Sequence, residues 1–317
     1  MAKYRDSLPQ LGGGLFLTDG GLETTLIFHD GLDLPYFAAF DLLKTPAGRE
    51  ALKRYFSNHA SIAVANGCGF ILESPTWRAS SDWGAKLGYS DVDMAEVNKQ
   101  SIDQLAELRQ IFETERSPMV ISGCVGPRGD GYNPGEVMSP DTAQAYHAGQ
   151  IDVFAQTAAD LVTAITMTNE AEAIGVTRAA QAAGIPVVIS FTVETDGRLP
   201  SGQPLKDAIE AVDAATGEGP AYFMINCAHP DHFDEALAAG ESWVGRIKGL
   251  RANASRLSHA ELDEAEELDD GNPEEFGQQH RELRRKLGHI TVMGGCCGTD
   301  HRHIEAICQA CGETQAA

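Results

Sequence analysis

The sequence is poor in positive charge and has no long apolar run. It contains 24 Lys and Arg residues against 46 Asp and Glu residues, and its formal net charge is -22 at pH 7. Such a surface repels phosphate backbones and anionic lipids, which disfavours nucleic acid and membranes as partners. No run reaches the roughly 18–20 apolar residues of a membrane span, and residues 1–10 hold charges where a secretory signal has its apolar core. We therefore expect a cytoplasmic protein.

The sequence also lacks a dinucleotide-binding fingerprint and a disulfide framework. No Gly-x-Gly-x-x-Gly follows the first predicted strand, and the glycines at 12–14 precede it, where they cannot cradle a pyrophosphate. The seven cysteines are an odd number scattered through a chain that has no export signal. Clustered cysteines in a reducing compartment indicate metal binding or catalysis.

What the sequence does contain is a repeated alternation of short apolar runs and helical stretches. We predict strands at 15–19, 70–76, 119–123, 161–167, 186–193, 222–227, 246–250 and 290–293. We predict the long helices at about 46–66, 91–114, 139–159, 169–183, 204–215, 231–239, a stretch ending near 287, and 300–311. Eight such units in roughly 300 residues favour a closed (β/α)8 TIM barrel over an open doubly wound sheet. We expect one domain over residues 1–317.

The strongest candidate site is the stretch Gly294–Thr299, in which Cys296 and Cys297 are bracketed by glycines. Glycines around a thiol pair indicate close backbone approach. In a regular strand the two thiols would point to opposite faces, so a shared ligand requires the strand to end there. Cys227 closes another apolar run. Three thiolates can hold a zinc ion with one coordination position open, which is typical of catalytic zinc.

The barrel prediction would bring these distant residues together. Active sites in this fold lie at the C-terminal ends of the strands. The candidate residues that end predicted strands are Asp19, Gly20, Thr76, Asn226, Cys227, Cys296 and Cys297. We therefore expect a zinc site at that end of the barrel.

Three motifs together resemble the homocysteine S-methyltransferase family, which includes betaine-homocysteine methyltransferase and the homocysteine domain of methionine synthase. The motifs are Asp19-Gly20-Gly21, Asn226-Cys227 and Gly294–Thr299. Further matching positions extend the resemblance over nearly the full length: Ser122–Pro127, Ser190–Val193, Gly197–Gly202 and His303-Ile304. The resemblance implies that Cys227, Cys296 and Cys297 bind zinc and that the open position takes an acceptor thiol.

The implied activity is methyl transfer to homocysteine, giving methionine, or to a related thiol. Zinc coordination would form the attacking thiolate at neutral pH. The donor must carry an activated methyl group, on a sulfonium or a quaternary ammonium, aligned for in-line displacement. The resemblance also implies that Asp19 lies near the acceptor's amino group. Gly20 and Gly21 would give backbone amides to its carboxylate, and Asn226 would shape the pocket beside Cys227.

Two departures from the family pattern concern substrate contacts. Ile165 stands where family members commonly carry a glutamate that is expected to hold the amino group of homocysteine. After the second strand, Thr76 is followed by Trp77 and Arg78, where the family often has tyrosine and glutamine. Trp77 could box an onium donor by cation-π contact or merely pack, and Arg78 could pair with a substrate carboxylate or face solvent. We hypothesise that these changes shift the acceptor toward a thiol acid without an amine, such as 3-mercaptopropionate.

Two alternatives to methyl transfer remain open. A zinc hydrolase or lyase would keep water in the open position and use Asp19 or Glu73 as a base. A non-catalytic zinc or thiol-binding barrel is the other.

We interpret the acidic segment Ser258–Asp270 as a solvated loop or helix face, with a lid as the alternative. Cys308 and Cys311 have zinc-knuckle spacing without a second pair, so we take them as structural. The sequence leaves the methyl donor and the oligomeric state open, including a homo-oligomer.

Overall fold

The structure, a computed structural model, describes residues 1–132, 135–237, 240–265 and 267–312. Eight parallel strands follow one another around a closed barrel, and β8 pairs with β1 to complete it. The strands are β1 (Phe16–Leu17), β2 (Gly69–Glu73), β3 (Met119–Val125), β4 (Leu161–Met167), β5 (Val187–Thr192), β6 (Tyr222–Asn226), β7 (Ile247–Ala252) and β8 (Val292–Gly295). The predicted (β/α)8 barrel is confirmed.

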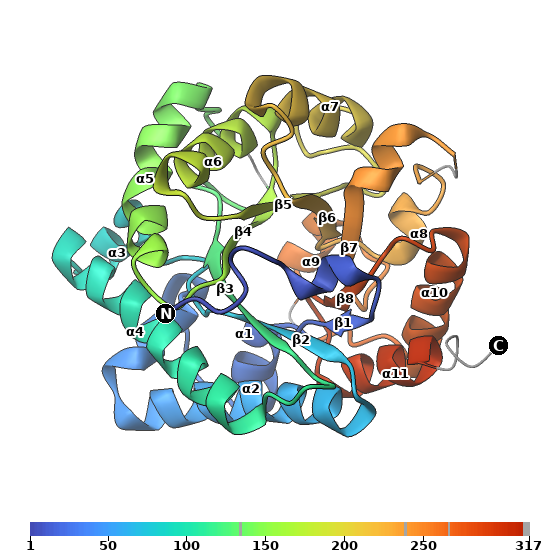
Figure 1. Cartoon of the computed structure of the whole chain (residues 1–317), viewed down its shortest axis with the longest axis horizontal. Helices are drawn as coiled ribbons and strands as arrows, with labels where there is room; N and C mark the ends of the chain where they lie inside the picture. The colour runs from blue at the N-terminus through green and yellow to red at the C-terminus, as the bar shows by residue number, and fades with distance from the viewer. Residues whose placement is uncertain (133–134, 238–239, 266, 313–317) are drawn as a thin grey trace.

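Helices surround the strands (Figure 1). The long ones are α2 (Pro46–Asn66), α4 (Asp91–Phe112), α5 (Pro140–Ala155), α6 (Glu170–Ala183), α7 (Leu205–Thr216), α10 (Pro273–Lys286) and α11 (His301–Gly312). Shorter turns of helix are η1 (Pro9–Gly12), α1 (Leu22–Thr24), η2 (Thr25–His29), η3 (Pro35–Phe37), η4 (Ala39–Lys44), α3 (Ser81–Lys86), α8 (Pro230–Phe233), η5 (Ser242–Arg246) and α9 (His259–Asp263). Within the described ranges, no helix combines the length and the apolar character needed to cross a membrane.

The start of α2 follows the capping signal in the sequence, whereas the helix predicted after β6 is wrong. Thr45 caps α2 by accepting a hydrogen bond from the Gly48 amide at 3.0 Å, and Pro46 occupies the first turn. The helix predicted at 231–239 is wrong in length, because α8 ends at Phe233. The Asp234 carbonyl, just beyond the end of α8, accepts from Lys286 Nζ at 2.7 Å. The end of that predicted helix, residues 238–239, lies outside the described residues.

The barrel interior contains two layers of side chains. The lower layer is an apolar cluster to which seven strands contribute: Phe16, Ile71, Val120, Leu161, Val188, Tyr222, Met224 and Val292. At the remaining strand, β7, Gly249 leaves room for Met224. Two residues further along the strands, toward their C-terminal ends, the side chains become polar. This polar layer includes Glu73, Ser122, Thr163, Ser190 and Arg251, all buried. We call the C-terminal ends of the strands, next to this layer, the barrel mouth.

Candidate functional site

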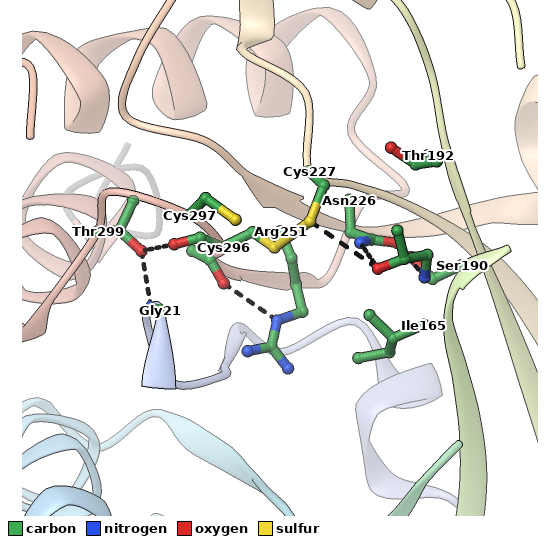
Figure 2. The surroundings of a disulfide bond; sticks show 12 residues. Gly21, Ile165, Ser190, Thr192, Asn226, Cys227, Arg251, Cys296, Cys297 and Thr299 are labelled. Carbon is green, nitrogen blue, oxygen red and sulfur yellow. Dashed lines mark hydrogen bonds between the residues drawn. A yellow bond between two sulfur atoms is a disulfide. The ribbon is translucent and has the colours of Figure 1, made fainter. Parts of the chain in front are cut away.

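Three thiols meet at the barrel mouth. Cys227 directly follows β6, and Cys296 and Cys297 directly follow β8. Their sulfur atoms lie within 4.8 Å of one another, and within the described part of the chain this is the one group of metal-ligating type brought together. Cys227 and Cys296 are joined by a disulfide and Cys297 is a free thiol (Figure 2). The barrel rule therefore predicted the meeting of the three residues, and their role as metal ligands stays a prediction.

The three thiols fit a zinc ion once the disulfide is reduced. Tetrahedral zinc with Zn–S bonds of roughly 2.3 Å places its sulfur ligands about 3.8 Å apart. None of the three separations exceeds 4.8 Å, and the bonded sulfurs of Cys227 and Cys296 would have to move apart to this distance on reduction. Three thiolates form a ligand set that zinc prefers, and they leave one of four positions open.

The backbone around the thiols is tightly constrained. Cys227 has a φ of 53°, in the left-handed region, and its amide donates to the Arg251 carbonyl at 3.1 Å. A side chain at Gly294 would overlap Thr18 Oγ1. Gly298 has a φ of 79°, which favours glycine. The glycines beside the thiol pair therefore allow the close approach that their sequence indicated.

Tyr132 and His259 lie against the thiols, and the sequence reasoning missed both. Tyr132 Oη is 3.2 Å from Cys297 Sγ, and its ring stacks on the His259 imidazole with centroids 4.0 Å apart. His259 Nε2 donates to the Cys227 carbonyl at 2.7 Å. His259 is the first residue of α9, within the acidic segment, and is only 6% exposed. The segment thus reaches the site through its histidine, whereas Glu264 and Glu267 are exposed, as the solvated interpretation predicted.

Arg251 is the centre of a buried ion network at the mouth, and it too was missed. Its Nη2 donates to Asp19 at 2.7 Å, its Nη1 donates to Glu73 at 3.0 Å, and its Nε donates to the Gly295 carbonyl at 3.1 Å. The Tyr55 hydroxyl donates to the other Asp19 oxygen at 3.0 Å. The Asp19 carboxylate is therefore engaged on both oxygens. Arg251 lies at the end of a β strand, as the other site residues do, so the strand-end rule could have found it.

Glu23 is a further carboxylate at the mouth. It lies in α1, directly after the Asp19-Gly20-Gly21 motif, and is half-buried. Burial raises its pKa to about 7, the Asp19 charge adds to this rise, and a hydrogen bond with its own backbone and the charges of Arg251 and Arg78 oppose it. The charge of Glu23 in turn contributes to a raised pKa of the Cys297 thiol, for which burial is the larger cause.

Arg78 and Trp77 form a stack instead of facing solvent. The Arg78 guanidinium carbon lies 4.1 Å from the centroid of the Trp77 ring and 3.8 Å from that of Trp83. Arg78 is 5% exposed and donates to the Gly129 carbonyl at 2.9 Å. Trp77 Nε1 donates to the Ile165 carbonyl at 3.2 Å. A protein cation therefore already lies over the Trp77 ring, the arrangement that was considered for an onium donor.

The glycine motif after β1 is held against the chain that follows β8. The Gly21 amide donates to both oxygen atoms of Thr299, the carbonyl and Oγ1, at 3.0 Å each (Figure 2). The Gly20 carbonyl accepts from the Tyr55 hydroxyl at 2.9 Å. The Gly21 amide is thus used within the protein. The suggested contact of these amides with an acceptor carboxylate stays a prediction.

Asn226 and Thr76 make internal hydrogen bonds. Asn226 Oδ1 accepts from the Thr166 amide at 3.0 Å and from the Ser190 hydroxyl at 2.6 Å, and its Nδ2 donates to Thr166 Oγ1 at 2.8 Å. These bonds hold the β4 irregularity, where Thr166 has a φ of 65°. Thr76 Oγ1 donates to the Cys124 carbonyl at 2.8 Å. Asn226 therefore supports the strand end that carries Cys227.

Comparison with known proteins gives a consistent result. The homocysteine S-methyltransferase family model matches residues 16–311. Homocysteine S-methyltransferase 3 of Arabidopsis thaliana is 22% identical over 96% of this chain and 92% of its own length. Selenocysteine Se-methyltransferase of Brassica oleracea var. italica is 24% identical over 93% of this chain and 88% of its own.

A solved structure shares the fold. The Escherichia coli homocysteine methyltransferase MmuM in its oxidized form gives a TM-score of 0.72 at 20% identity, over 96% of this chain and 99% of that chain. The same enzyme has also been solved in a metallated form, with a TM-score of 0.70 at 17% identity over 94% of this chain and 96% of that one.

Proposed function

This chain belongs to the homocysteine S-methyltransferase family, and we propose that it moves a methyl group from a sulfonium or quaternary ammonium donor to a thiol, using zinc held by Cys227, Cys296 and Cys297. The family makes it a thiol S-methyltransferase. The observation that carries the zinc proposal is the meeting of three thiols from two strand ends within 4.8 Å. The metallated form of MmuM supports it, since that enzyme shares the fold.

The bound zinc would lower the pKa of the acceptor thiol, so that the attacking sulfur is a thiolate at neutral pH. The acceptor's proton leaves to solvent. The new sulfur–methyl bond forms as the donor's bond to that methyl breaks, and the electron pair stays with the donor heteroatom, which becomes neutral. Because a positive charge is lost in this step, the site has to align the reactants more than stabilise a new charge.

The residues around the thiols have supporting roles in this proposal. When Cys297 is a thiolate, the Tyr132 hydroxyl donates to its sulfur and fixes its direction. His259 holds the Cys227 carbonyl, and Asn226 holds the preceding strand end. The donor's positive charge is favoured by the acidic field of a chain with a net charge of -22.

Zinc hydrolysis is disfavoured by the positions of its suggested bases. Asp19 and Glu73 are both paired with Arg251, at 2.7 and 3.0 Å. Zinc binding also requires Cys227 and Cys296 as free thiols, which supports a reducing compartment, and we propose the cytoplasm. A homo-oligomer remains a prediction that light scattering would check.

The experiment that tests the function combines acceptors with donors. The protein is reduced with a phosphine, loaded with zinc, and incubated with homocysteine, selenocysteine or 3-mercaptopropionate. Each acceptor is paired with betaine, S-methylmethionine, S-adenosylmethionine or dimethylsulfoniopropionate, and products are read by mass spectrometry. We expect a methylated acceptor with at least one donor, and loss of that product when zinc is removed by a chelator. Product formation that survives complete zinc removal would contradict the proposal.

A further inference from the structure

The carboxylates at the barrel mouth differ in their partners. Asp19 and Glu73 each form an ion pair with Arg251. Glu23, in contrast, makes no hydrogen bond or ion pair with another residue in the described part of the chain. A half-buried carboxylate without a cationic partner costs stability, so its presence at a reactive site calls for a ligand that completes it.

The surroundings of Glu23 locate this carboxylate at the mouth. The charges that act on it belong to Asp19 after β1, Arg78 after β2 and Arg251 in β7. Its own charge acts on the Cys297 thiol after β8. The next residue of α1, Thr24, accepts a hydrogen bond from the Gly298 amide through its Oγ1 at 3.1 Å. The short helix that carries Glu23 therefore packs against the segment that carries Cys296 and Cys297.

We propose that Glu23 binds the ammonium group of an amino-acid thiol acceptor and thereby selects such acceptors over thiols without an amine. The proposal rests on the proposed thiol methyl transfer and names the acceptor class for that same site. An ammonium group has three N–H donors, and a carboxylate with free lone pairs accepts them in charge-assisted hydrogen bonds.

The cation of the methyl donor is a poorer partner for Glu23. An onium group bearing only carbon has no N–H to donate, and it loses its charge as the methyl moves. A carboxylate next to it would stabilise the donor before transfer more than at the transition state, which slows the reaction. The ammonium of the acceptor keeps its charge throughout, so binding it carries no such penalty.

Glu23 also compensates for the apolar residue at 165. Ile165 lies in β4 and is 8% exposed, and Figure 2 shows it on the same side of the thiols as the Arg251 guanidinium. Arg78, the other basis for an acceptor without an amine, is enclosed between Trp77 and Trp83. Within the described part of the mouth, Glu23 is therefore a carboxyl group without a cationic partner, supplied from α1 rather than from β4.

The test uses two acceptors that differ only in the amine, homocysteine and 4-mercaptobutanoate. Both are titrated into the reduced, zinc-loaded protein by calorimetry, and kcat/KM is measured with the donor that the screen identifies. We expect homocysteine to bind about 10- to 100-fold more tightly than 4-mercaptobutanoate, since one charge-assisted hydrogen bond of a buried group is lost. Glu23→Gln should remove most of this difference by weakening the binding of homocysteine, and should change the binding of 4-mercaptobutanoate much less.

Two further variants separate binding from structure. Glu50→Gln changes an exposed α2 carboxylate and should keep the preference for homocysteine. Adding Ile165→Glu to Glu23→Gln should restore part of it, because an anion returns to the mouth from β4. In the metal-free reduced protein, Glu23→Gln should raise the midpoint of thermal unfolding, whereas removing a residue with a structural role would lower it.

Specific outcomes would overturn the assignment. Equal binding of the two acceptors by the wild type would do so and would support an acceptor without an amine. An equal loss of both acceptors in Glu23→Gln would also overturn it. If the expected binding difference appears but no donor yields a methylated product, the proposed methyl transfer fails and the assignment of Glu23 stands.

Discussion

The two layers of the barrel interior follow the same two-residue repeat along the strands, but they are stabilised by different interactions. Ile71 is followed two residues later by Glu73, and Val120 by Ser122. The lower layer needs only contact between apolar side chains. In the polar layer each buried group needs a specific partner, and these partners are other residues of the mouth. Asp19 and Glu73 are thus occupied by Arg251, whereas the three thiols lie outside this network.

Loss of a thiol should produce the largest effect. Loss of a residue that merely supports a metal ligand typically costs 10- to 100-fold, so we expect Cys297→Ser to lower methyl transfer on the order of 10³-fold and to reduce zinc content. The matched control is Cys308→Ala, a buried cysteine of α11, which should keep both. Zinc content by mass spectrometry and kcat/KM check this. A Cys297→Ser protein with full zinc content and full turnover would contradict the role of Cys297 as a zinc ligand.

The second-largest effect should be a loss of folding stability when the ion pairs of the polar layer are broken. Arg251→Met leaves the Asp19 and Glu73 carboxylates buried without their cation, and we expect the free energy of unfolding to fall by about 3–5 kcal/mol. Arg256→Met removes an arginine that is 53% exposed and should cost less than about 1 kcal/mol. Urea unfolding monitored by circular dichroism measures both. Similar losses in the two variants would show that the network is not integral to the fold.

An intermediate effect should appear in the pH dependence of stability. The carboxyl pKa of Glu23 rises from 4.5 to about 7 on folding. Between these values the native state binds more protons than the unfolded chain, so this residue makes stability fall as pH rises from about 4.5 to 7. Glu23→Gln should therefore be more stable than wild type by roughly 1–2 kcal/mol above pH 7 and nearly equal below pH 4.5, a discounted range because the group is half-buried. Denaturant titrations at pH 4.5 and 8 test it, and a pH-independent difference would contradict it.

The smallest effect should come from the phenol that contacts the thiols. Tyr132→Phe removes one hydrogen bond to Cys297 and keeps the ring stacked on His259. We expect kcat/KM to fall by roughly 10-fold, the lower end of the range for one hydrogen bond to a charged group, because the thiolate charge would be shared with the zinc ion. His259→Ala should cost more, because the Cys227 carbonyl loses its donor as well as the stack. A reversed order of the two variants would contradict these roles.

The sequence predicted the barrel and the meeting of the thiols because both depend on local repeats. Each strand end is marked by an apolar run, and the fold brings Cys227 and Cys296 to one side whatever their neighbours do. The charged contacts were not predictable in this way. Whether Asp19 is free or paired depends on Arg251, which lies 232 residues away in sequence. The contact of Arg78 with Trp83 likewise depends on the position of α3, which the hydrophobic pattern of the sequence did not predict.

The most direct measurement of the central claim is X-ray absorption at the zinc edge of the reduced, zinc-loaded protein, with and without homocysteine. The account predicts three sulfur ligands in the protein alone, at roughly 2.3 Å, and four when the thiol is bound. Fewer than three sulfur ligands in the protein alone, or a count that does not change with the thiol, would contradict it.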